Sequence, residues 1–330
     1  MTTALPVGRR ARVRVPATSA NLGPTFDAAG LALDLHDDVE VTVVDPHGEG
    51  AAGLHFDVVG EGADDIARDE THLVAATVLQ VFRSLDVETP ALAITCHNRI
   101  PHGRGLGSSA AAIVAGVLVA RELVPGGVQA LPLPRVLDLV AEYEGHPDNV
   151  AAALLGGLTL AWRGGPPVLG GTAGDGAFLV SGRETAVLRL TPAPAVRPVV
   201  LVPPTSSSTH SARGRLPDTV AHADAAVAAG RGALLAAALT IAPVALLPAT
   251  HDVLHQQYRA PLMPATTDLV AALRDRGLAA VVSGAGPTVL VLAADADQEH
   301  AALASAPAGW RALTLPVAGG ATAELVDAGA

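Results

Sequence analysis

The sequence predicts two α+β domains, and three observations lead to this fold class. Strand-like and helix-like segments alternate along the whole chain. A stretch rich in glycine and proline, residues 163–176, divides the chain near its middle. Half of the 330 residues are apolar, which is enough to fill the cores of two domains of ordinary size. We therefore expect an N-terminal domain over residues 1–165 and a C-terminal domain over residues 166–330.

The N-terminal half of the chain contains the apolar patterns typical of strands and of helices. Alternating or continuous apolar residues predict three strands, at residues 10–17, 38–45 and 91–100. Apolar residues at helical spacing predict three helices, at residues 69–85, 108–124 and 134–144. Residues 19–33 are interrupted by glycine and proline and are expected to form a loop. Residues 151–162 are expected to run from a short helix through two glycines into a strand.

The C-terminal half repeats the mixture. A buried strand is expected at residues 197–204, and a strand, a glycine turn and a second strand at residues 279–293. Residues 216–239 are expected to be helical in two pieces around Gly230, because glycine is a poor helix former. A further helix is expected at residues 266–277, where Gly277 provides a C-terminal cap.

The composition excludes several classes of protein. The formal net charge of −11, with no basic patch interleaved with aromatic residues, argues against nucleic-acid binding. The single cysteine, Cys96, excludes an internal disulfide and a cysteine-based zinc site. The N-terminus has no apolar stretch typical of a signal peptide, and no window has the uninterrupted apolar length of a membrane span. We expect a soluble cytoplasmic protein without nucleic-acid or membrane partners.

The segment PHGRGLGSSAA, residues 101–111, has the composition of a phosphate-binding loop. Its glycines allow the backbone to approach a ligand closely, and it opens a predicted helix whose N-terminus attracts anions. The hydroxyls of Ser108 and Ser109 could cap the helix, bind phosphate or ligate a metal ion. The alternative is a tight turn between strand and helix in which glycine serves only packing.

The chain contains no lysine, since all 21 basic residues are arginine. A Walker-type P-loop, a pyridoxal enzyme and a protein-kinase-like site each need a lysine and are therefore excluded. Gly103, Gly105 and Gly107 give G-x-G-x-G in place of the G-x-G-x-x-G of a dinucleotide-binding turn. Backbone N–H groups, the helix dipole and Mg²⁺, which prefers oxygen ligands, could together replace the missing lysine.

Other polar residues lie near turns. Glu144, Asp148 and Asn149 surround a proline turn, where they could bind a metal ion and orient a hydroxyl, or merely form an Asx turn. Asn21 and Asp27 lie in the loop at residues 19–33. Arg213 and Arg259 lie among turn signals, and neither arginine by itself indicates a function. His251 and His255 have the i, i+4 spacing of a zinc site, but two surface histidines explain it better.

Taken together, these stretches resemble the homoserine kinases, a family in the superfamily of galacto-, homoserine, mevalonate and phosphomevalonate kinases (GHMP kinases). The resemblance covers nearly the whole chain and rests on six segments in family order: VPATSANLGPTFDAAGLAL, PHGRGLGSSAAA, EGHPDNVAAALLGG, SSTHSAR, LHQQYRAPLMP and VSGAGPTVLVL. It implies an N-terminal domain like ribosomal protein S5 and a C-terminal ferredoxin-like domain. The implied reaction is phosphorylation of the L-homoserine side-chain hydroxyl by ATP, a step of threonine biosynthesis, in a homodimer.

The resemblance also implies roles for single residues. ATP would be bound by Pro101, His102, Gly103, Arg104, Gly105, Leu106, Gly107, Ser108, Ser109, Ala110 and Ala111. Mg²⁺ would be held by Ser109 and Glu144. Asn21, Asp27, Asp148 and Asn149 would line the amino-acid pocket, and Arg213 and Arg259 would bind the substrate carboxylate. Residues 284–288 would form a turn near both ligands.

Four positions depart from the family pattern. Thr25 stands where glycine is usual and could alter substrate selectivity. His72 replaces a frequent asparagine near the adenine pocket, and His210 replaces a frequent lysine. The place of an aspartate base in some relatives falls near Ala151, so a dedicated base is doubtful. A sister kinase acting on another small alcohol and a non-catalytic ATP-binding sensor remain the alternatives.

Overall fold

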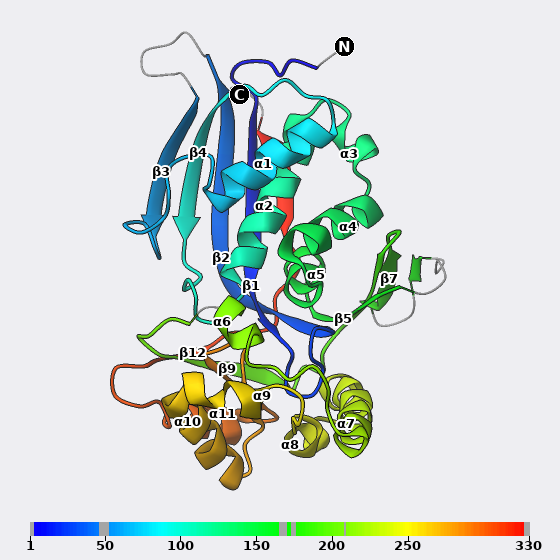
Figure 1. The fold of residues 1–330 in the computed structure, drawn as a ribbon, viewed down its shortest axis with the longest axis vertical. Coiled ribbons are helices and arrows are strands. Elements are labelled where there is room, and N and C mark those ends of the chain that lie inside the picture. Colours follow the sequence, from blue (N-terminus) through cyan, green and yellow to red (C-terminus); the bar gives the residue numbers. More distant parts are fainter. Residues whose placement is uncertain (1–2, 46–52, 165–169, 173–175, 208, 327–330) are drawn as a thin grey trace.

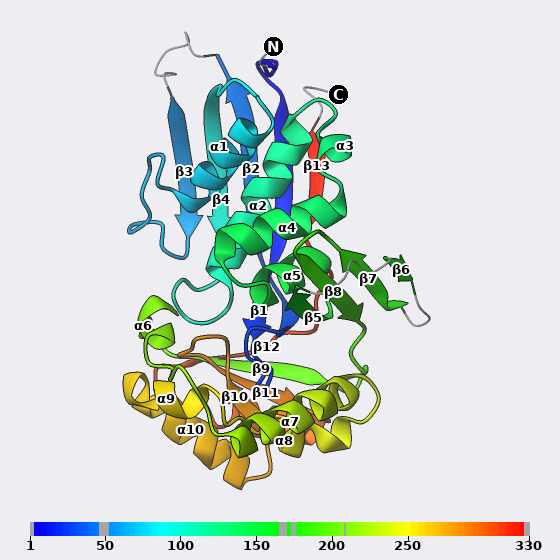
Figure 2. The same ribbon diagram turned by 45° about the vertical axis from the view of Figure 1, so that its right-hand side comes forward.

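A large sheet occupies the upper part of the molecule in Figures 1 and 2, and a smaller antiparallel sheet occupies the lower part. The computed structural model describes residues 3–45, 53–164, 170–172, 176–207 and 209–326. Helices accompany both sheets, so the predicted α+β class is confirmed. Val326, at the end of the described residues, pairs with Arg10 near their beginning.

The large sheet is built around two long neighbouring strands, β1 and β2. In the first half of β1, Val13 and Val15 are buried and Arg12 and Arg14 are exposed. This is the alternation that the apolar pattern of the sequence predicts for a strand. Among the described residues the sheet comprises β1 (Arg10–Ala20), β2 (Ala29–Val44), β3 (Leu54–Gly60), β4 (Ala91–Asn98), β5 (Leu158–Arg163), β6 (Gly171–Thr172), β7 (Phe178–Ser181), β8 (Thr185–Leu190) and β13 (Thr322–Val326). The strand order is β13-β1-β2-β5-β8-β7-β6, and β4 pairs with β2 and, in parallel, with β3.

Helices cover one face of this sheet (Figure 1). They are α1 (Leu73–Ser84), α2 (Ser108–Leu123), α3 (Gly127–Ala130), α4 (Leu133–Glu144) and α5 (Asp148–Leu155). Helix α2 is apolar on nearly all sides because it packs against β1 as well as against α1, α4 and α5. This packing fixes the N-terminus of α2 at the lower end of the large sheet, where the two parts of the molecule meet (Figure 2).

The smaller sheet has the order β10-β11-β9-β12 and is antiparallel throughout. Its strands are β9 (Arg197–Val202), β10 (Ala280–Val282), β11 (Val289–Ala293) and β12 (Arg311–Thr314). Helices α6 (Thr209–Arg213), α7 (His222–Thr240), α8 (Leu246–Ala249), α9 (Gln256–Arg259), α10 (Pro264–Asp275) and α11 (Ala296–Leu303), with 3₁₀ turns at Pro243–Ala245 and Ala260–Leu262, complete this part. Val199 and Leu201 join the small core of this part, whereas Val200 and Val202 join the main core, so both faces of β9 are buried.

The sheets do not divide where the two halves of the sequence do. Strands β7 and β8 follow residue 165 yet pair in the large sheet, and β13 returns to it beside β1. The division between residues 165 and 166 stays a prediction about domains, because the large sheet continues to Leu190 and is rejoined by β13 after the smaller sheet. The expected linker at 163–176 contains residues outside the described ranges, and its described part includes β6.

Two local expectations are wrong. The loop expected at residues 19–33 is shorter, because β1 extends to Ala20 and β2 begins at Ala29. Helix α7 runs through Gly230 and Gly232 without a break, since each glycine costs a helix only about 1 kcal/mol and alanines flank the two glycines.

Helix α7 also bears on the expectation about membranes. Among the described helices it is long and apolar enough to cross a membrane by length and composition, with a hydropathy of 1.2. Asp224 and Arg231 interrupt its apolar residues, and Leu235 and Leu239 are buried in the main core. One such helix is weak evidence for a membrane segment.

Candidate active site

The loop at residues 101–107 connects β4 to α2 and turns on glycines in left-handed conformations. Gly103, Gly105 and Gly107 have φ angles of 63°, 75° and 72°. A Cβ atom on Gly105 would collide with the backbone of Ser283, and one on Gly107 would collide with the hydroxyl of Thr18. Both the backbone conformation and the close neighbours therefore require glycine here. The strand–loop–helix order predicted for this segment is confirmed, and it points the backbone N–H groups at the start of α2 toward a cavity.

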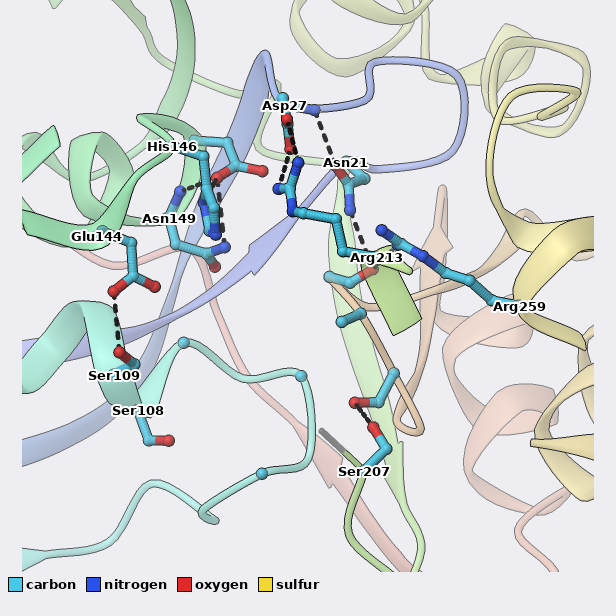
Figure 3. A pocket seen from close by; sticks show the side chains of 17 residues that line it. Asn21, Asp27, Ser108, Ser109, Glu144, His146, Asn149, Ser207, Arg213 and Arg259 are labelled. Carbon is cyan, nitrogen blue, oxygen red and sulfur yellow. Dashed lines mark hydrogen bonds and ion pairs between the residues drawn. The ribbon is translucent and has the colours of Figure 1, made fainter. Parts of the chain in front are cut away.

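This cavity lies between the two parts of the molecule (Figure 3). It is lined by Asn21, Asp27, Gly103, Gly105, Gly107, Ser108, Ser109, Glu144, His146, Asp148, Asn149, Ser207, Arg213, Arg259, Gly284, Ala285 and Gly286. In Figure 3 the acidic and hydroxyl groups of Glu144 and Ser109 occupy one side, and Arg213 and Arg259 extend from the opposite side. The cavity is therefore polar and lined by groups of both charges.

Glu144 ends α4 opposite the first turn of α2. The hydroxyl of Ser109 donates a hydrogen bond of 2.9 Å to Oε2 of Glu144. Burial raises the pKa of Glu144, and the hydrogen bond from Ser109 only partly opposes this effect. The Glu144 carboxylate and the Ser109 hydroxyl are oxygen donors of the kind that Mg²⁺ prefers, so the donor set fits that ion.

Asp148 forms the centre of a second polar group. It is only 2% exposed, and its Oδ1 accepts hydrogen bonds from the backbone N–H of Asn149 and from Nδ1 of His146, both at 2.8 Å. Burial lowers the pKa of His146, but the hydrogen bond and charge of Asp148 outweigh burial and the net direction is upward. Asp27, His146 and Asp148 offer ligand atoms within 4.8 Å of one another, so two carboxylates lie close together here.

The two arginines lie beside the ring of Phe26. Arg213 donates from both terminal nitrogens to both carboxylate oxygens of Asp27, each at 2.8 Å. Arg259 is 2% exposed, and its Nη1 donates to the carbonyl of Gly284 at 3.3 Å. Burial and the neighbouring charge of Arg213 lower the pKa of Arg259. Their guanidinium carbons lie 5.3 Å and 5.4 Å from the Phe26 ring centre, so one aromatic ring supports both cations.

The loop that carries Asn21 and Asp27 has an unusual backbone. Asn21, Leu22 and Asp27 have φ angles of 68°, 45° and 55°, a region that residues other than glycine rarely occupy. The Asn21 side chain holds the loop, because Nδ2 donates to Gly284 at 3.0 Å and Oδ1 accepts from the N–H of Asp27 at 3.0 Å. Backbone strain that the surroundings maintain in this way is typical of functional sites.

Thr25 does not line the cavity. Its hydroxyl donates to the carbonyl of Asn21 at 2.6 Å, and its methyl group faces Gly232 of α7. In the structure Thr25 therefore stabilises the loop between β1 and β2. The side chain of His210 lies outside the described residues.

A second cavity adjoins the first and shares Ser108 and Ser109 with it. Its walls are mainly apolar and include Val39, Ile66, Leu73, Val74, Ala111 and Ala112 together with His72, Cys96 and His102. Burial lowers the pKa of His72 and of His102, which favours their neutral forms. An apolar cavity next to a glycine loop and the N-terminus of α2 could hold a nucleobase whose phosphates lie over the start of that helix.

Comparisons with known proteins identify the family of the chain. The models of the GHMP kinase N-terminal and C-terminal domains match residues 72–157 and 225–312. The chain is 52% identical to the homoserine kinase of Streptomyces coelicolor over 91% of this chain and 90% of that protein. It is 47% identical to the homoserine kinase of Clavibacter michiganensis over 100% of this chain and 98% of that protein.

The chain belongs to the homoserine kinase family. The predicted family and its two-domain GHMP architecture are thereby confirmed. Solved structures have the same fold: the homoserine kinase of Cytophaga hutchinsonii superposes with a TM-score of 0.75 at 23% identity, over 96% of this chain and 97% of that one. A putative homoserine kinase of Listeria monocytogenes gives a TM-score of 0.65 at 28% identity, over 95% of this chain and 99% of that one.

The resemblance to the homoserine kinases predicted a set of site residues, and most of these residues line the two cavities. Asn21, Asp27, Asp148, Asn149, Arg213, Arg259, Glu144 and the loop residues Gly103, Gly105, Gly107, Ser108 and Ser109 line the first. His102 and Ala111 line the second.

Four residues of the predicted ATP loop line neither cavity. Pro101, Leu106 and Ala110 are buried and shape the loop from behind. The Arg104 guanidinium donates to the carbonyls of His102, Pro203 and Pro204, so it fastens the loop to the smaller part.

Sequence reasoning missed His146 and Ser207, which both line the first cavity. His146 follows Gly145 in the proline turn, and its position beside Asp148 was the available signal. Ser207 donates to the carbonyl of Gly286 at 3.0 Å, a contact between distant segments that no local pattern indicates. His251 and His255 do not form a metal pair, since His251 is exposed and His255 is buried with its Nε2 at 2.8 Å from the Gly23 carbonyl.

Proposed function

We propose that this chain transfers the γ-phosphoryl group of ATP to the side-chain hydroxyl of L-homoserine and forms O-phospho-L-homoserine, a step of threonine biosynthesis. One observation carries the proposal: a single cavity joins a glycine loop at a helix N-terminus to two arginines and to the carboxylates of Asp27, Glu144 and Asp148. ATP needs the first of these features, and an amino acid with a free carboxylate and ammonium group needs the other two.

ATP would place its base in the apolar cavity and its phosphates over the N-terminus of α2. The backbone N–H groups of the glycine loop and the dipole of this 16-residue helix supply positive potential in place of a lysine. Ser109 and Glu144 would hold Mg²⁺, which when bound would neutralise charge on the phosphates. The Thr18 hydroxyl donates to Oδ1 of Asn149 at 2.8 Å. The same hydroxyl packs against Gly107 and so supports the loop.

Homoserine would bind on the opposite side of the cavity. Arg213 and Arg259 present guanidinium groups to its carboxylate, and a guanidinium group can pair with both oxygens at once. Asp27 and Asp148 carry the negative charge that an ammonium group requires. The substrate hydroxyl would then lie between this group and the phosphate loop.

No carboxylate stands where some relatives carry a base, because that place is taken by buried Ala151 in α5. A loose phosphoryl-transfer transition state places little demand on proton removal by the enzyme. The residues of this cavity would act mainly by aligning the hydroxyl oxygen with the γ-phosphorus and by stabilising charge. The hydroxyl oxygen forms the new P–O bond as the bond to ADP breaks, and the hydroxyl proton passes to a phosphate oxygen or to water.

A coupled assay of ADP release tests the proposal. Homoserine, threonine, mevalonate and galactose are compared at equal ATP concentration, and homoserine should give much the highest kcat/KM. Preference for mevalonate or galactose would indicate a sister kinase. ATP binding without turnover of any alcohol would indicate a sensor. A cytoplasmic homodimer completes the proposal, and light scattering coupled to size-exclusion chromatography measures its oligomeric part.

A further inference from the structure

We propose that His255 is a positioning residue, which as a neutral imidazole holds Arg259 in the orientation needed for the substrate carboxylate. This inference rests on the proposed function, because it concerns the same substrate. His255 precedes α9, and Arg259 ends that helix four residues later. His255 is 0% exposed, so the imidazole acts only through its protein neighbours.

The two ring nitrogens of His255 have partners that determine the position of its proton. Nε2 lies 2.8 Å from the carbonyl oxygen of Gly23, which can only accept a hydrogen bond. Nδ1 lies 3.2 Å from Nη1 of Arg259, which can only donate one. The tautomer with hydrogen on Nε2 and a lone pair on Nδ1 satisfies both partners, and the other tautomer satisfies neither.

The charges around the ring favour this neutral form. Burial and the charge of Arg259 lower the pKa of His255. The facing carboxylates, Asp252 and Asp27, oppose this but do not reverse it. Asp252 Oδ2 lies 3.7 Å from Nε2 and already accepts from the backbone N–H groups of His255 and Gln256. A proton on Nδ1 would face the guanidinium directly, which is unfavourable in a buried site.

Arg259 has few other constraints on its orientation. Its Nε lies 3.4 Å from the Ala212 carbonyl and its Nη1 lies 3.3 Å from the Gly284 carbonyl, both long for hydrogen bonds. Within the described part of the chain, no residue accepts from Nη2. His255 therefore ties one edge of the guanidinium to the protein and leaves Nη2 for a ligand in the cavity that Arg259 lines.

His255 also connects Arg259 to the strained loop. Gly23 lies between Asn21 and Asp27, and it is packed so closely that a Cβ atom would collide with the Thr250 carbonyl. One imidazole thus links the loop that carries Asn21 and Asp27 to Arg259. This link fixes the position of Arg259 relative to the loop that carries Asp27.

Steady-state kinetics of three variants test the inference. His255→Leu removes both hydrogen bonds at similar volume, whereas His255→Gln can donate from its amide nitrogen to Gly23 and accept from Arg259 at its amide oxygen. We expect His255→Leu to raise KM for homoserine about fivefold to tenfold, the range of a lost hydrogen bond, and to change KM for ATP less than twofold. His255→Gln should recover most of the loss. His251→Leu, at an exposed histidine nearby, is the matched control and should match the parent.

Homoserinol, which lacks the carboxylate, separates positioning from general damage. His255→Leu should leave its kinetics nearly unchanged. In an Arg259→Ala background, His255→Leu should add little to KM for homoserine, because the residue through which it acts is gone. Equal losses for the two substrates, or full additivity with Arg259→Ala, would overturn the proposal.

The parent protein provides a test that needs no folded variant. The ¹⁵N chemical shifts of the His255 ring should report hydrogen on Nε2 alone at neutral pH. Hydrogen on Nδ1, or on both nitrogens, would contradict the proposal. Failure of the parent to phosphorylate homoserine would instead contradict the proposed function, and the ring shifts would still decide the contacts of His255.

Discussion

Asp27 and Arg213 form a two-point ion pair across the cavity, with both nitrogen–oxygen distances at 2.8 Å. Asp27 belongs to the loop between β1 and β2, and Arg213 ends α6 in the smaller part of the molecule. The pair joins segments 186 residues apart and raises the pKa of Arg213 through the Asp27 hydrogen bonds. An amino acid carries both charges that this pair contains, so its carboxylate and ammonium group can replace the two partners.

This exchange predicts the behaviour of Arg213 variants. Arg213→Ala should weaken the binding of homoserine about tenfold to a hundredfold, the range expected for a charged hydrogen bond of roughly 1.5–3 kcal/mol. Arg213→Lys should recover only part of the loss, because an ammonium group cannot reproduce the guanidinium fork. KM for ATP should change little in either variant.

Homoserinol provides the sharper measurement for Arg213. It keeps the ammonium and hydroxyl groups but lacks the carboxylate, so it should be a poor substrate for the parent and lose little further in Arg213→Ala. Losses of the same size for homoserine and homoserinol would mean that Arg213 serves the fold or the nucleotide instead.

Glu144 should govern the requirement for Mg²⁺. Glu144→Gln keeps the shape of the side chain and can still accept from Ser109, but it removes the charge. We expect kcat to fall strongly and the Mg²⁺ concentration for half-maximal activity to rise, with a modest loss of homoserine binding. Glu142→Gln, on the exposed side of the same helix, is the matched control. Superimposable Mg²⁺ titrations of Glu144→Gln and the parent would rule out the ligand role.

Gly107 should be essential for ATP binding for a steric reason that Gly126 does not share. Both residues have a φ angle of 72° and precede a helix, so alanine meets the same backbone strain at each. A Cβ atom at Gly107 collides with Thr18 and approaches Asn149, whereas at Gly126 no atom lies within 4 Å. Gly107→Ala should therefore lower the affinity for ATP much more than Gly126→Ala does, and Gly107→Val should abolish ATP binding. Calorimetric titration with ATP measures this, and equal affinities of the two alanine variants would contradict it.

The local part of the site could be predicted from the sequence. A strand, a glycine loop and an apolar helix follow one another at residues 91–124, and each leaves a signal in neighbouring residues. Glu144 and Asp148 were singled out for the same reason, since they surround a proline turn. Family motifs added Arg213 and Arg259, which no local pattern distinguishes from surface arginines.

The non-local part could not be predicted. Asn21 donates to the carbonyl of Gly284, 263 residues away, and spacing in the sequence carries no information about such a contact. The pairing of β13 with β1 also joins opposite ends of the chain. The tertiary context also overrides Gly230, which leaves α7 unbroken.

Asp37 should make the stability of the protein depend on pH. It is 6% exposed and lines the apolar cavity, and burial raises its pKa from about 3.8 to about 6, although the N–H groups of Arg99 and Ile100 donate to it. Between these values the folded protein keeps a proton that the unfolded chain releases, so the Asp37 contribution to the free energy of unfolding is complete below about pH 4 and is lost as pH rises through about 6. Asp37→Asn keeps an acceptor for both N–H groups and cannot ionise. The difference in the free energy of unfolding, variant minus parent, should therefore rise by at most about 3 kcal/mol between pH 4 and pH 6.5 and then level off. Urea denaturation across this range without nucleotide measures the difference. A difference that stays constant with pH, or falls as pH rises, would show that Asp37 does not carry this burial cost.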